Sequence, residues 1–337
     1  MSGKADFREA IAAQPAWLRR AADLAGEALA SVTQTWQADE TVAVVGMGAS
    51  TNAGAVFVAA LRDRGVRAVN LDASSVRGFP AGYKPADHVI VISESGRSPE
   101  PIAAAARMGV APIVVTNDPS SPVTQGASLV VPLGGFADSG VYTIGYTTTL
   151  VALAAVAEAF GAPIADPGAL AGIAETALRD FAGDAPALAE ALDERWFLDI
   201  TGQGCSAGSA QAVALLFREA PGTPTAAFET LQYLHGPMES SGPHGAAMLF
   251  GDGRENGVAA QLRDAGALVI QCVTHPGTTP GAHHLSQVAD GYAGAVAEIV
   301  FAQLIAAELA SRRGVTVGEF RFPQTDTKLP WLGGSLT

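Results

Sequence analysis

The chain has 337 residues, of which 48% are hydrophobic and 16% are charged, and its net charge is −13. This length and apolar content allow a large core, and the acidic balance argues against nucleic acid as a partner. Cys205 and Cys272 form no CxxC pair, which indicates a reducing compartment. We expect a cytoplasmic protein with no membrane contact, because we find neither a secretory leader nor an uninterrupted apolar run of spanning length. No metal or organic cofactor is expected.

The first half of the chain alternates predicted strands with predicted helices. Residues 5–35 have helical spacing, and Pro15 is predicted to restart the helix. Strands are predicted at 42–45, 68–71, 88–92, 113–116 and 129–131, and helices at 52–63, 99–107 and 143–160. Such alternation predicts a parallel sheet covered on both faces.

The second half repeats this plan after an Ala/Leu-rich helical linker at 169–192. Strands are predicted at 196–201, 248–250 and 268–272, and helices at 211–220 and 293–312, the last of them amphipathic. Gly48-Ala-Ser50 and Gly204-Cys-Ser206 occupy matching places in the two halves. The chain is therefore predicted to contain an internal duplication of architecture.

Two turns rich in glycine and hydroxyl residues follow buried strands of the first half. TVAVVGMGAST spans 41–51, and HVIVISESGRSPE spans 88–100. Strand, turn and helix together direct backbone N–H groups and hydroxyls at an anion, and ligands of open α/β sheets bind at the carboxyl ends of strands. We therefore expect the two turns to converge on one phosphate. The alternative is that Ser98 only caps a helix that starts at Pro99.

These motifs resemble those of the sugar isomerase (SIS) domain family. Ser93–Ser98 is similar to the family's S-Q-S-G-E-T phosphate loop, and Gly48–Ser50 to its G-T-S turn. Gly140–Thr143 lies at the place of its G-V-A-S segment, and Phe7–Pro15 resembles its opening helix. The chain is particularly similar to the isomerase half of glucosamine-6-phosphate synthase and to stand-alone phosphosugar isomerases and deaminases.

The resemblance implies an α/β chain of two SIS domains. Each is a doubly wound parallel sheet flanked by helices, in a flavodoxin-like three-layer sandwich. The expected limits are 1–36 for N-terminal helices, 37–162 for a phosphate-binding domain, 163–193 for the linker, 194–313 for the second domain and 314–337 for a tail over the active site. A homodimer with shared active sites is also implied.

The resemblance also assigns residues to the sugar phosphate. The residues implied to bind the phosphate are Ser50, Ser93, Ser95, Ser98 and Thr143, and the further substrate contacts are Gly48, Ala49, Glu94 and Gly96. Glu94 stands where the family usually has glutamine, and Arg97 stands where glutamate is common.

Three further residues fall on the family's catalytic positions. Glu219 matches the base that moves a proton between C1 and C2, and His235 in the His-Gly-Pro motif matches the ring-opening histidine of the neighbouring subunit. Lys328, three residues later than the family's tail lysine, is assigned imine formation or orientation of O1. Taken singly, Glu219 is more often a solvated helix residue and His235 more often a loop histidine that bonds to a carbonyl. For Lys328, a solvated tail position is equally compatible with the pattern. The family's other ionisable residues on the Glu219 helix are replaced by Ala212 and Leu216.

The expected function is isomerisation of a phosphorylated sugar, or deamination of an amino-sugar phosphate, without a glutaminase domain. Two alternatives stay open. Ala212 and Leu216 favour a non-catalytic phosphosugar sensor, whereas Glu219 and the His-Gly-Pro motif favour catalysis. A deglycase of phosphorylated fructosamine adducts would use the same residues.

Overall fold

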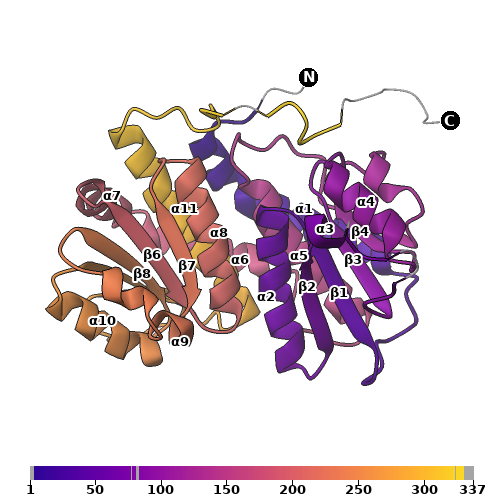
Figure 1. Ribbon diagram of the computed structural model, residues 1–337, viewed down its shortest axis with the longest axis horizontal. Coiled ribbons are helices and arrows are strands. Elements are labelled where there is room, and N and C mark those ends of the chain that lie inside the picture. The colour runs from indigo at the N-terminus through magenta and orange to yellow at the C-terminus, as the bar shows by residue number, and fades with distance from the viewer. Residues whose placement is uncertain (1–3, 77, 81–82, 323, 330–337) are drawn as a thin grey trace.

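The computed structural model describes residues 4–76, 78–80, 83–322 and 324–329. Two five-stranded parallel sheets lie side by side, and helices cover both faces of each (Figure 1). The predicted α/β architecture is confirmed at this level.

The first sheet has the strand order β2-β1-β3-β4-β5. Its strands are β1 (Thr41–Gly46), β2 (Arg67–Asp72), β3 (His88–Ile92), β4 (Ile113–Thr116) and β5 (Leu129–Pro132). All neighbouring strands are parallel. The strand order reverses direction between β1 and β3, and in doubly wound sheets ligands bind beside such a switch point.

The second sheet repeats the first in its strand order and in its turns. Its order is β10-β9-β8-β6-β7, and its strands are β6 (Phe197–Gly202), β7 (Thr225–Glu229), β8 (Gly245–Phe250), β9 (Leu268–Val273) and β10 (Ala282–His284). Gly48 has φ 57° and ψ −126°, and Gly204 has φ 57° and ψ −124°. This left-handed conformation favours glycine, so the duplication extends to the backbone of the turn after the first strand of each half.

The helices fill the connections between strands. Those of the first half are α1 (Phe7–Leu29), α2 (Ala49–Asp63), α3 (Ala73–Val76), α4 (Pro99–Arg107) and α5 (Ile144–Ala159), with a 3₁₀ turn at Pro122–Thr124. Those of the second are α6 (Leu170–Phe181), α7 (Ala185–Asp193), α8 (Cys205–Glu219), α9 (Thr230–Tyr233), α10 (Arg254–Asp264) and α11 (Tyr292–Arg312), with a 3₁₀ turn at Pro237–Ser240. The sequence did not predict β7, α9, α10 or β10, and α8 begins six residues before its predicted start.

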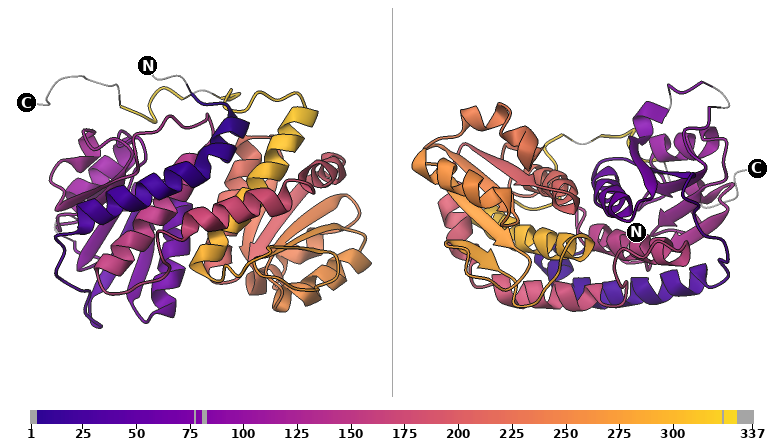
Figure 2. Two further views of the ribbon diagram at one scale, coloured as in Figure 1. Left: turned by 180° about the vertical axis from the view of Figure 1, so that it is seen from behind. Right: turned by 90° about the horizontal axis from the view of Figure 1, so that it is seen from below.

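The prediction that Pro15 restarts the first helix is wrong, because α1 continues through it. Proline lacks the N–H that would bond to the carbonyl four residues back. Gln14 supplies the missing donor, since its Nε2 donates to the carbonyl of Ile11 at 3.0 Å. The same Nε2 donates to Gln303 Oε1 at 2.8 Å, which ties α1 to α11. Figure 2 shows α1 running along the back of the first half, with one end beside α11.

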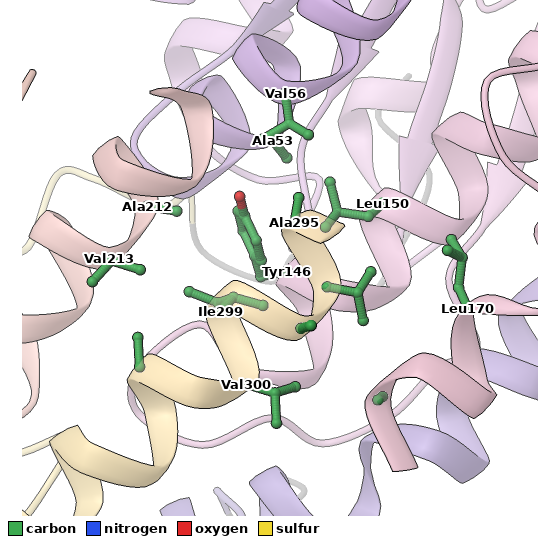
Figure 3. Close-up of a cluster of buried hydrophobic side chains, with 14 of the residues drawn as sticks. Ala53, Val56, Tyr146, Leu150, Leu170, Ala212, Val213, Ala295, Ile299 and Val300 are labelled. Carbon is green, nitrogen blue, oxygen red and sulfur yellow. The ribbon is translucent and has the colours of Figure 1, made fainter. Parts of the chain in front are cut away.

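A shared core joins the two halves. Tyr146 of α5 is buried among Val56 of α2, Ala212 of α8 and Ile299 of α11 (Figure 3). Close approach of α2 and α8 requires glycine at 208, because a Cβ there would lie 2.6 Å from the backbone nitrogen of Val56. The two halves are therefore packed directly against each other through helices that start at equivalent turns.

Helix α11 differs from its predicted amphipathic character. Its residues are buried on nearly all sides. It is the one helix in the described part of the chain long and apolar enough to cross a membrane, and 83% of its most apolar window is buried inside the protein. It packs against α6, α7 and α8 as the central helix of the second half.

Candidate active site

A cavity of about 300 Å³ opens at the carboxyl ends of β1 and β3. It lies at the switch point of the first sheet, next to the start of α2. Its walls come from both halves and from the tail. They comprise Met47, Gly48, Ala49, Ser50, Ile92, Ser93, Glu94, Ser95, Ser98, Pro101, Asp138, Ser139, Gly140, Tyr142, Leu215, Glu219 and Lys328. The two hydroxyl-rich turns thus meet in one cavity.

Two serine hydroxyls of the second turn have no partner among the described residues. Ser98 is the N-cap of α4, but its side chain makes no capping hydrogen bond. Ser93 is buried at the end of β3, and its hydroxyl also lacks a hydrogen bond within the described part of the chain. Unpaired hydroxyls at a helix N-terminus are available to an anion. The simple capping interpretation of Ser98 is therefore not what the structure shows.

Gly96 supports the turn from behind and does not line the cavity. Its φ of 64° is left-handed, and a Cβ there would lie 1.7 Å from Ser121 Oγ. Its carbonyl accepts from the backbone N–H of Val123 at 3.1 Å, while Ser95 Oγ accepts from the N–H of Arg97 at 3.3 Å. Gly96, predicted to contact substrate, is therefore placed against the 3₁₀ segment and not in the cavity lining.

Thr143 also lies outside the cavity lining. It is fully buried, and its hydroxyl donates to the carbonyl of Val141 at 2.8 Å. Ser139, which the sequence analysis did not select, lines the cavity instead, and its Oγ lies 3.0 Å from Thr143 Oγ1. The G-V-A-S resemblance located the correct segment, but the backbone turns its threonine inward.

Asp138 holds this segment in place. Its carboxylate accepts backbone N–H groups from Ser139 (2.8 Å), Thr143 (2.9 Å), Ile144 (3.1 Å) and Gly145 (2.8 Å). Burial nevertheless raises the pKa of this carboxyl, because the charged form loses its water. Asp138 therefore supplies the N-terminal cap of α5 and shapes one cavity wall.

Replacement of Asp138 with alanine should destabilise the protein by about 2 kcal/mol, because four backbone N–H groups, three of them at the start of α5, lose their acceptor. Urea unfolding monitored by circular dichroism measures this change. Asp166→Ala is the matched control, since within the described part of the chain the Asp166 carboxylate accepts a single N–H, that of Gly168 at 2.9 Å. Equal losses for the two variants would contradict the capping role.

Glu219 reaches the cavity from the other half of the molecule. It is the last residue of α8, is partly buried and has no hydrogen-bond partner among the described residues. Burial raises its pKa above the usual carboxyl value. A carboxylate at a helix C-terminus also faces the negative end of the helix dipole, which favours the protonated form further. A partly buried carboxyl with a raised pKa in a cavity is typical of a group that transfers protons in catalysis.

The tail brings Lys328 to the same cavity. The chain passes from α11 toward the first half (Figure 1), and the N–H of Leu329 donates to the carbonyl of Arg97 at 2.9 Å. Lys328 lines the cavity and is otherwise exposed. Residues 323 and 330–337 of the predicted tail lie outside the described residues.

Comparison with solved structures identifies the fold. The chain superposes on the C-terminal domain of glucosamine-fructose-6-phosphate aminotransferase from Francisella tularensis with a TM-score of 0.79, at 16% identity, over 94% of this chain and 98% of that one. It superposes on glucosamine-6-phosphate deaminase from Thermotoga maritima with a TM-score of 0.78, at 18% identity, over 95% and 98%. For tagatose-6-phosphate ketose/aldose isomerase from Escherichia coli the TM-score is 0.74, at 17% identity, over 97% and 96%.

The chain has the SIS fold. No protein-family model and no curated protein sequence matches it. At these identities the likeness shows the fold alone, so the chemistry of the site has to be argued from its own residues.

His235 is not brought to the cavity of its own chain. It follows α9, is exposed and does not line the site.

Among the described residues there is no group of three His, Cys, Asp or Glu side chains able to hold a metal ion. Nine of the predicted site residues do line the cavity: Gly48, Ala49, Ser50, Ser93, Glu94, Ser95, Ser98, Glu219 and Lys328.

In the second half, a carboxylate of the protein itself lies beside the turn at Gly204–Ser206, which is equivalent to the turn at Gly48–Ser50. Glu255 is 3% exposed, and its Oε1 accepts from Gln203 Nε2 at 3.0 Å and from Thr230 Oγ1 at 2.6 Å. Its carboxylate thus uses donors beside the turn that matches the hydroxyl-rich turn of the first half. A second anion would meet a like charge there, which favours the first half as the binding site.

Among the lining residues that the sequence analysis did not select, Asp138, Ser139 and Tyr142 are those with polar side chains. A weak signal was present, because an aspartate shortly before a predicted helix start is a capping pattern. No local pattern of this kind marks Tyr142 as a cavity residue, since its position depends on packing against α5, where its hydroxyl bonds to Thr149 at 2.9 Å.

Proposed function

We propose that the chain binds a phosphorylated sugar and moves a proton between C1 and C2 of its open-chain form. The reaction class is aldose–ketose isomerisation, or deamination where C2 carries an amine. The three compared structures carry names of a sugar-phosphate aminotransferase, a deaminase and a ketose/aldose isomerase, which supports this class.

The observation that carries the proposal is the meeting of free hydroxyls and a buried carboxyl in one cavity. Ser93 and Ser98 offer donors at the start of α4, and Ser50 lies in the first turn of α2. Glu219 faces the same space from α8. An anion held at one end and a base at the other match a ligand with a phosphate remote from its reacting carbons.

In the proposed course the phosphate binds the hydroxyl turns and fixes the sugar. Glu219 removes the proton beside the carbonyl or imine carbon and returns it to the neighbouring carbon. Lys328 either orients O1 or condenses with the carbonyl of the open-chain sugar to form an imine, and this condensation releases water. No histidine lines the cavity within the described part of the chain, so we assign ring opening to His235 of a second subunit.

The test of the function is proton exchange in deuterated water. A panel of hexose and hexosamine 6-phosphates is incubated with the purified protein, and NMR follows loss of the C2 proton together with ammonia release. Exchange without ammonia establishes an isomerase, and exchange with ammonia establishes a deaminase. Saturable binding without exchange for any sugar would overturn the catalytic proposal.

Mixing two inactive variants tests the shared site. Glu219→Gln and His235→Ala should each lose activity, and random mixed dimers should recover about one quarter of the wild-type rate, because half are mixed and each contains one intact site. The measurement is the exchange rate after unfolding and refolding the two variants together. No recovery, with dimers present by ultracentrifugation, would place His235 outside the site.

A binding-only function is the second candidate. The exposed position of His235 favours it, since the cavity of one chain lacks a ring-opening group. The exchange experiment distinguishes the two candidates directly.

A further inference from the structure

The cavity has an unusual charge balance for a phosphate site. Its lining contains three carboxyl side chains, Glu94, Asp138 and Glu219. Lys328 is its only cationic lining residue among those that the structure describes. Burial raises the pKa of each of the three carboxyls. A phosphate monoester adds about −1.5 to −2 charges at pH 7, so its binding brings further negative charge into an already acidic cavity.

Two of these carboxyls already have a role in the site. Asp138 accepts four backbone N–H groups, which hold its charge in place. Glu219 comes from α8 in the other half and acts on the reacting carbons in the proposed function. Glu94 is different, because it belongs to the phosphate turn itself, between Ser93 and Ser95.

Glu94 is poorly compensated where it lies. Its Oε1 accepts a long hydrogen bond of 3.3 Å from Asn117 Nδ2, and its other oxygen has no partner in the described part of the chain. The guanidinium of Arg97 pairs with Asp118 at 2.8 Å and also favours the charged form of Glu94. Lys328 is the cation that acts on Glu94 most strongly, and its side chain is exposed on the tail.

We propose that Glu94 takes up a proton when the phosphate of the ligand binds, so that ligand binding and protonation of this carboxyl are coupled. The inference rests on the proposed function, since it concerns the same site. A second anion next to Glu94 favours its neutral form, and the neutral carboxyl then presents an O–H donor to the cavity through its unpartnered oxygen.

Other titratable groups face Glu94 from every side of the cavity. They are Asp138 and Tyr142 from the segment before α5, Lys328 from the tail, Arg97 from its own loop, and Glu219 from α8. Because the other carboxyls of the cavity and the phosphate itself also bind protons, only a comparison of matched variants isolates Glu94. Glu94→Gln is well suited, since its amide oxygen still accepts from Asn117.

The experiment is calorimetric titration with inorganic phosphate and with glucitol 6-phosphate, which has no carbonyl and cannot react. Kd is measured from pH 5 to pH 8 for the wild type, Glu94→Gln and Glu100→Gln. Glu100 is the matched control, since it lies in the first turn of α4 but outside the cavity lining. The ratio of wild-type Kd to Glu94→Gln Kd should rise by about tenfold between pH 5 and pH 8, which corresponds to uptake of one proton per ligand over about one of these three pH units.

Repeating the titration at one pH in two buffers of different ionisation enthalpy counts the protons directly. The wild type and Glu100→Gln should take up more protons per ligand than Glu94→Gln. A Kd ratio constant within twofold, with equal proton counts, would overturn the inference while leaving the proposed function in place. Absence of binding to wild type and Glu94→Gln at every pH would overturn both.

Discussion

Replacement of Glu219 with glutamine is expected to lower the rate of C2-proton exchange by about 10²–10⁴-fold, the usual contribution of a general base. The amide has nearly the same shape as the carboxyl but cannot accept the proton. Because Glu219 has no hydrogen-bond partner among the described residues, the substitution breaks no contact. Sugar-phosphate binding, which depends on the hydroxyl turns, should change less than about threefold.

The pH dependence of the wild type provides a second measurement of the same group. Burial raises the pKa of Glu219, and the base is active only when ionised. The rate should therefore fall on the acid side with a midpoint above the ordinary carboxyl value of about 4.3. Glu229→Gln is the control, because Glu229 caps α9 outside the cavity, and it should leave the rate unchanged. An unchanged rate in Glu219→Gln would remove Glu219 from the mechanism.

Gly96→Ala should destabilise the protein by about 3 kcal/mol and weaken phosphate binding at least tenfold. Two effects add, since alanine at a φ of 64° is strained by about 1 kcal/mol and its methyl group overlaps Ser121 at a cost of about 2 kcal/mol. Relief of the overlap moves the turn that carries Ser93, Ser95 and Ser98. Thermal unfolding and phosphate titration measure the two consequences.

Two variants separate the strain from the overlap. Gly135 has a φ of 72° and open space where its Cβ would lie, so Gly135→Ala should cost only about 1 kcal/mol. The double variant Gly96→Ala, Ser121→Gly removes the overlapping side chain and should recover about 2 kcal/mol. If Gly96→Ala and Gly135→Ala prove equally stable, Ser121 does not support the turn.

The first half shows how far local sequence patterns reach. The predicted strand at 88–92 and helix at 99–107 have the bounds found in the structure. Short β-branched runs and Pro99 at the first helical position are strong local signals. Elements with weak local signals were not predicted. Helix α10 is polar, with only four buried residues, and β10 has only three residues, so the sequence of each is difficult to distinguish from that of a loop.

The sequence by itself determined the α/β class, the duplicated turns and the pair of hydroxyl-rich segments, because each depends on neighbouring residues. It did not decide which side chains face the cavity. Thr143 turns inward because Asp138 binds the backbone around it, and Gly96 is turned toward Ser121 by its left-handed backbone. Only tertiary packing brings Glu219, at the end of a helix in the other half, to the phosphate turn, since no local pattern encodes contacts between distant segments.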